Sequence, residues 1–218
     1  MKVTIIDYGI SNILSVARAL SHCGAETLIT DSADDIIQAE ALILPGVGAF
    51  GDGMRGLREK NLLEPIKIYA SKGHPFMGIC LGMQMMLSTS EEFGIHEGLS
   101  LIPGRVVRME GTTIHGEPHK IPHIGWNNLR LPLGKTNSFW EKTILSGFEE
   151  NEEVYFVHSY TAVPDNEEHR LADAYYGGRL ISAVIRKDNL WGCQFHPEKS
   201  GLVGLKIIEN FLQYSKAI

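Results

Sequence analysis

Cysteine is scarce in this chain of 218 residues, which holds three: Cys23, Cys80 and Cys193. They form no close pairs, so the sequence provides neither a disulfide framework nor the paired spacing of a zinc site. An odd number of separated thiols suits a reducing compartment. We therefore expect a cytoplasmic protein.

Long hydrophobic runs are missing as well. No stretch approaches the roughly 18 to 20 apolar residues that a membrane-spanning helix needs. The apolar stretch near the N-terminus is interrupted by Asp7 and is too short for a signal peptide. We expect no membrane association, and we expect this stretch to form the first strand of the fold.

Basic residues do not exceed acidic ones, because 20 Lys and Arg stand against 26 Asp and Glu, for a net charge of −6. This balance gives no electrostatic footprint for nucleic acid. The chain also shows no linker, repeat, low-complexity segment or Walker-type phosphate loop, and no cofactor is predicted. With 44% hydrophobic residues it can build a sizeable core, so we expect one domain over residues 1–218.

Strand and helix patterns alternate along the first half of the chain. They predict strands at 3–6, 27–29 and 41–44 and helices at 13–20, 54–60 and 62–72. The second half predicts strands at 105–109, 154–159, 172–176, 181–186 and 190–195, an irregular stretch at 129–151 and a closing helix at 203–214. The alternation predicts an α/β fold in three layers, with a mostly parallel central sheet and helices on both faces.

Cys80 is the most informative residue. It follows the apolar run 75–77 and precedes a helix-prone run, with Gly78 two residues before it and Gly82 two residues after. Small flanking residues let a strand turn sharply into a helix and present a nucleophile at the apex. The N-terminus of that helix stabilises a thiolate. A buried structural cysteine is the alternative, and the glycine spacing favours the nucleophile.

A thiolate nucleophile needs a base, and the base needs a group that orients it. His196 stands at the end of the predicted strand 190–195, and Pro197 stiffens its link to Glu198. If this link stays extended, the two side chains point the same way and the carboxylate can fix the imidazole tautomer. His-Pro-Glu alone is also a common surface turn, but together with Cys80 it predicts a Cys-His-Glu triad. This chain order differs from that of the α/β-hydrolases and argues against an esterase.

These segments resemble the class I, triad-type glutamine amidotransferases. The superfamily resemblance rests on residues 78–84 (GICLGMQ) and 194–200 (QFHPEKS). Within the superfamily, the chain is similar over nearly its whole length to the glutaminase subunits of imidazole glycerol phosphate synthase. The segments that carry this finer resemblance are 7–9 (DYG) with Asn12, 44–52 (LPGVGAFGD), 122–127 (PHIGWN) and 155–160 (YFVHSY).

Amide hydrolysis by a thiolate passes through an oxyanion, which needs N–H donors already in place. The N–H of Leu81, directly after the nucleophile, is a natural donor. The resemblance implies Val47 as the second, after the glycine loop 45–48 reorients. Two glycines make such a reorientation possible, and they are equally compatible with a tight turn that needs glycine for its geometry. The resemblance also implies that Cys80 forms a γ-glutamyl thioester.

Further residues take their roles from the resemblance. Gln84 also stands one helical turn after Cys80, so it can face the same cleft. The residues implied to bind glutamine are Gly46, Gly48, Gln84, His158, Ser159 and Tyr160. The candidates for a subunit interface are Asn12, Tyr155 and Lys199.

A partner is expected, because ammonia released by a single glutaminase domain has to be used elsewhere. The resemblance implies a heterodimer with a barrel-type cyclase, which uses the ammonia in histidine and purine-precursor biosynthesis. The loop 10–14 departs from the family pattern, with Ser11 and Leu14 where the family usually has glycine and arginine. A glutaminase subunit for another synthase, such as a sugar amidotransferase of surface polysaccharides, is the alternative. A catalytically silent subunit is a further reading, and the intact triad argues against it.

Three histidines, His115, His119 and His123, are spaced four apart, which on a helix would suggest a metal face. Gly116, Pro118 and Pro122 make a continuous helix implausible there. No metal site is predicted.

Overall fold

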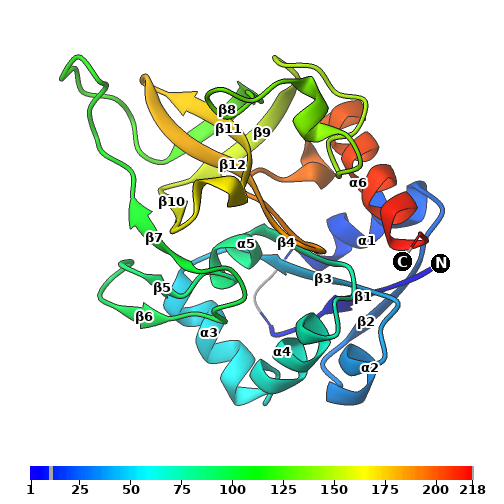
Figure 1. Ribbon diagram of the computed structural model, residues 1–218. Helices are drawn as coiled ribbons and strands as arrows, with labels where there is room; N and C mark the ends of the chain where they lie inside the picture. The colour runs from blue at the N-terminus through cyan, green and yellow to red at the C-terminus, as the bar shows by residue number, and fades with distance from the viewer. Residues whose placement is uncertain (10–11, 218) are drawn as a thin grey trace.

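The computed structural model describes residues 1–9 and 12–217 and centres on a seven-stranded sheet of order β11-β12-β13-β4-β3-β1-β2 (Figure 1). Five neighbouring strands run parallel: β1 Lys2–Ile6, β2 Glu26–Thr30, β3 Ala41–Gly46, β4 Phe76–Cys80 and β13 Leu190–Cys193. Two antiparallel strands extend one edge: β11 Arg170–Tyr176 and β12 Arg179–Lys187. The predicted α/β fold with a mostly parallel central sheet is confirmed.

Helices cover both faces of this sheet. One face carries α1 Ile13–His22 and α6 Gly201–Ser215, and the other carries α2 Ala33–Ile37, α3 Phe50–Glu59 and α4 Leu63–Ser71. Strand β3 shows why two cores form, because its side chains alternate between the faces. Ile43 packs into the core of α1 and α6, whereas Leu42 and Leu44 pack into the core of α3 and α4.

Strands of the second half also build two smaller sheets. One has the order β10-β7-β5-β6, from β10 Tyr160–Pro164, β7 Gly104–Arg108, β5 Thr89–Ser90 and β6 His96–Glu97. The other pairs β8 His123–Asn128 with β9 Glu153–His158. The predicted irregular stretch 129–151 holds the 3-10 helix η1 Asn137–Trp140, and η2 Glu167–His169 precedes β11. None of the described helices is long and apolar enough to cross a bilayer.

The start of helix α3 differs from the prediction because its first turns are rich in glycine. Helix α3 begins four residues before the predicted start, at Phe50, and contains Gly51, Gly53 and Gly56. Glycine lowers helix propensity, so this turn carries no helical signal in the sequence. Close packing requires two of these glycines: an added Cβ would lie 2.7 Å from the Met85 sulfur at Gly53 and 2.7 Å from a backbone oxygen at Gly56.

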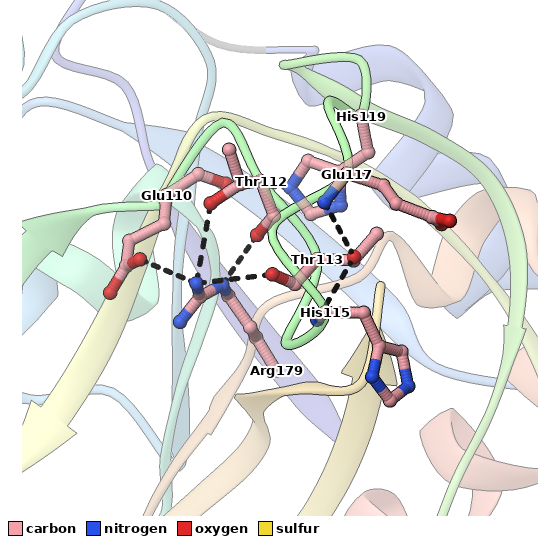
Figure 2. A network of polar contacts seen from close by, with 7 residues as sticks. All are labelled: Glu110, Thr112, Thr113, His115, Glu117, His119 and Arg179. Atoms are coloured by element: carbon pink, nitrogen blue, oxygen red, sulfur yellow. Dashed lines mark hydrogen bonds and ion pairs between the residues drawn. The ribbon is translucent and has the colours of Figure 1, made fainter.

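The loop between β7 and β8 is fastened by Arg179 of β12 (Figure 2). The Arg179 guanidinium pairs with the carboxylate of Glu110 at 2.7 Å and donates to the carbonyl oxygens of Thr112 and Thr113. This loop carries His119, whose ring stacks on Tyr176 with 4.5 Å between centroids. The loop is therefore attached to the same sheet edge that carries β11 and β12.

Candidate active site

Cys80 ends strand β4, and the short helix α5 Leu81–Met85 begins at the next residue. Its backbone has φ +54° and ψ −110°, a conformation that costs energy for any residue with a side chain and that is found mainly at functional sites. The two neighbouring glycines are needed for the turn. An added Cβ at Gly82 would collide with the Leu44 carbonyl oxygen, and one at Gly78 would lie 2.6 Å from the Met86 sulfur.

The imidazole of His196 is paired with a carboxylate. Its Nδ1 lies 2.7 Å from Oε1 of Glu198, and the two side chains are 2% and 1% exposed. The link between them is not extended, because Pro197 starts the 3-10 helix η3 Pro197–Lys199. Proline suits the first position of a helical turn, which here brings Glu198 back toward the ring.

The electrostatics around His196 favour a charged ring. Burial lowers the pKa of His196, but the adjacent Cys80 sulfur and the Glu198 carboxylate outweigh burial and raise the pKa to about 9. Its Nε2 is buried and makes no hydrogen bond to any described residue. That nitrogen can therefore exchange a proton with the sulfur or with a substrate in the cleft.

Cys80 and His196 open into a cleft of about 350 Å³. The predicted site residues that line it are Val47, Gly48, Cys80, Leu81, Gln84, His158, Ser159, Tyr160, His196 and Lys199. Glu92, Pro122 and Val157 line it as well and were not predicted. Two predicted site residues do not line the cleft: Glu198, which contacts Nδ1 of the imidazole, and Gly46, which ends β3. A larger hollow of about 670 Å³ lies against the start of β13, and its lining holds neither cysteine nor histidine.

The glycine loop lies directly beside the nucleophile. Gly46 pairs with Cys80 in the register of β3 and β4, so Val47 and Gly48 follow at the level of the turn between β4 and α5. Gly48 has φ +93°, which favours glycine, and an added Cβ at Gly46 would lie 2.6 Å from the Tyr8 hydroxyl. The two predicted N–H donors, on Val47 and Leu81, thus belong to adjacent walls of one cleft.

Gln84 lies on the cleft wall and is held by two hydrogen bonds. Its Nε2 donates to the carbonyl oxygen of Tyr160 and to Oε1 of Gln194, each at 3.1 Å. Gln194 was not predicted as a site residue, although it belongs to the segment that carries the family resemblance. Its own amide nitrogen lies 3.9 Å from the sulfur of Cys80, so it also borders the nucleophile.

Glu92 brings a carboxylate to the cleft. Its Oε2 accepts a hydrogen bond of 2.6 Å from the N–H of Phe50, the first residue of α3. A negative charge is favourable at this end of a helix. No local pattern marks Glu92 in the sequence, because its partner lies 42 residues away along the chain.

Of the interface candidates, Lys199 lines the cleft, whereas Asn12 and Tyr155 do not. Asn12 precedes α1 and accepts a hydrogen bond from the Ser15 hydroxyl, and Tyr155 meets Trp126 edge-on with 6.0 Å between centroids. The neighbourhood is apolar and open to solvent, with Leu14, Ile124, Trp126 and Leu202 between 54% and 84% exposed. Of the two atypical residues, Leu14 lies in α1, and Ser11 lies outside the described residues.

The three spaced histidines lie on a loop and a strand rather than on a helix. His119 and His123 stack on Tyr176, whereas His115 is exposed. Within residues 1–9 and 12–217, no group of three or more His, Cys, Asp or Glu side chains is placed to hold a metal ion.

Comparison with known proteins gives the same answer at three levels. The profile of the family "Glutamine amidotransferase class-I" matches residues 4–214. The chain is 55% identical over 212 residues to imidazole glycerol phosphate synthase subunit HisH 1 of Legionella pneumophila (strain Paris), covering 97% of this chain and 99% of that protein. It is 45% identical over 210 residues to subunit HisH of Geobacillus thermodenitrificans (strain NG80-2), covering 96% and 94%.

Solved structures show the same fold at low identity. PurLQS from Thermotoga maritima superposes with a TM-score of 0.70 at 22% identity, over 98% of each chain. A glutamine amidotransferase from Thermotoga maritima superposes with a TM-score of 0.58 at 17% identity, over 91% of this chain and 76% of that one. The chain belongs to the class I glutamine amidotransferase family, in the group of HisH subunits.

Proposed function

We propose that this chain is the glutaminase subunit of imidazole glycerol phosphate synthase. It hydrolyses glutamine to glutamate and ammonia, and it passes the ammonia to a cyclase subunit. One observation carries the proposal: a strained Cys80 lies beside a buried His196–Glu198 pair, at the mouth of a cleft of about 350 Å³. The identity of 55% to a HisH subunit over 97% of the chain supports the assignment to this synthase.

The raised pKa of His196 supports a thiolate–imidazolium pair as the reactive state. The Cys80 sulfur attacks the side-chain amide carbon of glutamine, and the oxyanion accepts hydrogen bonds from the N–H groups of Leu81 and Val47. Nε2–H of His196 then protonates the leaving nitrogen, so ammonia departs and a γ-glutamyl thioester remains. His196 next removes a proton from water, which attacks the thioester and releases glutamate and the free thiolate.

The cleft walls supply one acidic side chain and several neutral polar ones that can bind the amino-acid end of glutamine. We assign the Glu92 carboxylate to the α-ammonium group of glutamine, because it is the acidic group on the cleft lining. The wall formed by Gln84, Ser159 and Tyr160 holds the rest of the amino-acid end. Recognition at the end opposite the scissile amide places that amide against Cys80.

The partner is a barrel-type cyclase that forms a heterodimer with this chain. The exposed apolar side chains of Leu14, Ile124, Trp126 and Leu202 have the character of an interface core. We assign Asn12, Tyr155 and Lys199 to its rim. The three cysteines are free thiols, which supports a location in the cytoplasm.

The test is glutamate release by the purified chain, measured alone and then with the barrel cyclase and its ribotide ligand. We expect the chain alone to release glutamate about 10²- to 10³-fold more slowly than the complete complex, because the Val47 donor must reorient. The cyclase and ligand together should restore the rate. Cys80→Ala should abolish release, whereas Cys23→Ala should retain it, because Cys23 lies away from the cleft.

The same experiment tests the alternative that the chain delivers ammonia to a different synthase. Release that depends on Cys80 but is not stimulated by the cyclase would overturn the assignment to this synthase and leave a glutaminase for another one. Full release by the Cys80→Ala protein would overturn the glutaminase itself.

A further inference from the structure

Two buried histidines lie next to each other at the cleft: His158 lines it, and His123 does not. His123 begins β8 and His158 ends β9, and the register of these strands places them directly opposite each other. They are 3% and 5% exposed, and Nδ1 of His123 lies 3.1 Å from Nε2 of His158. Neither ring contributes a group to the proposed chemistry of Cys80.

The Tyr160 carbonyl group sets the direction of the hydrogen bonds that connect the two histidines. Nδ1 of His158 lies 2.9 Å from the carbonyl oxygen of Tyr160, which can only accept, so Nδ1 carries the proton. In a neutral ring Nε2 of His158 is then the acceptor, and it accepts from Nδ1–H of His123. Nε2 of His123 accepts in turn from the amide nitrogen of Asn127, at 3.4 Å.

This assignment of donors and acceptors requires that both histidine rings are neutral, and they are neutral near pH 7. Burial lowers the pKa of His158 to about 3 and that of His123 to about 4. A second proton on His158 would place two N–H groups face to face. The chain of hydrogen bonds therefore runs one way, from Asn127 through the two rings to the Tyr160 carbonyl.

The end of this chain is part of the cleft. The Tyr160 carbonyl accepts from Nδ1–H of His158 and also from Nε2–H of Gln84. Ser159, Tyr160 and Gln84 all line the cavity. Two donors from different elements thus fix the carbonyl group of Tyr160, a residue of the glutamine-binding wall.

Aromatic packing holds His123 in place. Its ring stacks on Phe156 and on Tyr176, with centroids 5.0 and 4.2 Å apart. Tyr176 also contacts His119, which lies on the loop fastened by Arg179 (Figure 2). His119 shares the aromatic stack with His123, but its Nε2 is bonded to the Glu110 carbonyl rather than to the histidine pair.

We propose that His123 is a positioning residue that acts through His158 to orient the Tyr160 carbonyl and so the glutamine-binding wall. The inference rests on the proposed glutaminase activity and deepens it. Loss of the proton at Nδ1 of residue 123 would leave Nε2 of His158 buried without a partner. His158 could then turn, and the wall would lose one of its two fixed points. Cys80, His196 and Glu198 contribute no atom to this chain of hydrogen bonds, so binding suffers more than chemistry.

The experiment compares two amides at one position, in the complex with the cyclase. An asparagine places its NH₂ near the position of Nδ1, whereas a glutamine places it near Nε2. We expect His123→Gln to raise KM for glutamine about 10-fold with kcat within about 3-fold, as for one lost neutral hydrogen bond and its unpaired acceptor. His123→Asn should stay within about 3-fold of the wild-type KM. His119→Gln, the matched control, should leave both parameters unchanged.

A binding measurement separates this from a general loss of structure. Calorimetry with glutamine and the Cys80→Ala protein should show an affinity about 10-fold weaker when His123→Gln is added, while the melting temperatures of the two amide variants stay similar. Equal KM values in the two amide variants, or a fall in kcat alone, would overturn the positioning role. An equal rise in KM from His119→Gln would also overturn it. If wild-type protein releases no glutamate, the proposed function itself fails.

Discussion

Oε1 of Glu198 lies 2.7 Å from Nδ1 of His196, and both side chains are almost completely buried. The carboxylate offsets the desolvation of the imidazolium, which burial alone would disfavour. A glutamine at position 198 keeps the size of the side chain and its oxygen but removes the charge.

We predict that Glu198→Gln lowers kcat for glutamate release about 10²-fold, because the imidazolium that protonates ammonia loses its counter-charge. KM should change little, since Glu198 lies behind the ring and away from the substrate. The measurement is steady-state glutamate release by the complex. A kcat within about 3-fold of wild type would show that the carboxylate does not act on the ring.

The same pair predicts how stability depends on pH. The pKa of His196 is raised to about 9 in the folded chain, above the ordinary value of 6.5, so the folded state binds the proton more tightly. This stabilisation is complete below pH 6.5 and is lost as the pH rises through about 9. The difference in free energy of unfolding between wild type and His196→Gln should therefore shrink between these values, in urea titrations. A difference that stays constant over this range would contradict the raised pKa.

At the turn between β4 and α5, one added methyl group should have a large effect on stability. Gly82→Ala would drive a Cβ into the Leu44 carbonyl oxygen, and backbone at the centre of the sheet cannot move aside cheaply. We expect a loss of about 3 kcal/mol or more in the free energy of unfolding, measured by chemical denaturation. Gly111→Ala is the control, because nothing lies within 4 Å of its added Cβ. That variant should stay within about 0.5 kcal/mol of wild type, and similar losses in both would refute the steric argument.

The sequence predicts well what depends on neighbours along the chain. The turn at Cys80 follows from glycines two residues away on each side, and the parallel strands follow from apolar runs that alternate with amphipathic ones. The buried runs of β3 and β4 are such cases, because burial on both faces leaves little room for polar residues.

What the sequence does not reveal depends on distant contacts. Glu92 reaches the cleft because β5 and β6 place it against the start of α3, and two-residue strands carry no periodic pattern. The spacing of His123 suggests only a metal face, because its pairing with His158 requires the register of β8 and β9. The sequence also leaves open whether the link at Pro197 is extended, since proline is compatible with an extended chain and with the first turn of a helix.

Glu92 allows a direct test of substrate recognition. We predict that Glu92→Gln raises KM for glutamine about 10-fold, because a charge-assisted hydrogen bond to the α-ammonium group is replaced by a neutral one. The amide oxygen can still accept from the Phe50 N–H, so the start of α3 should remain capped and the melting temperature should change little. Kinetics with glutamine should show this rise at nearly constant kcat. An unchanged KM would place the α-ammonium group elsewhere in the cleft.

Trp126 gives the sharpest test of the partner surface. Its indole is 54% exposed, meets Tyr155 edge-on and lies beside Gly201, near the triad. Large aromatic side chains of this kind supply much of the binding energy at interfaces, so Trp126→Ala should weaken binding of the cyclase by about 2 kcal/mol or more, roughly 30-fold in Kd. Stability of the free chain should stay within about 0.5 kcal/mol, because the side chain is largely solvated. Ile68→Ala is the control, since Ile68 is 43% exposed on α4 at the other face of the sheet and should not affect binding. Calorimetric titration of the two variants with the cyclase decides the matter: equal Kd values would place the interface away from Trp126.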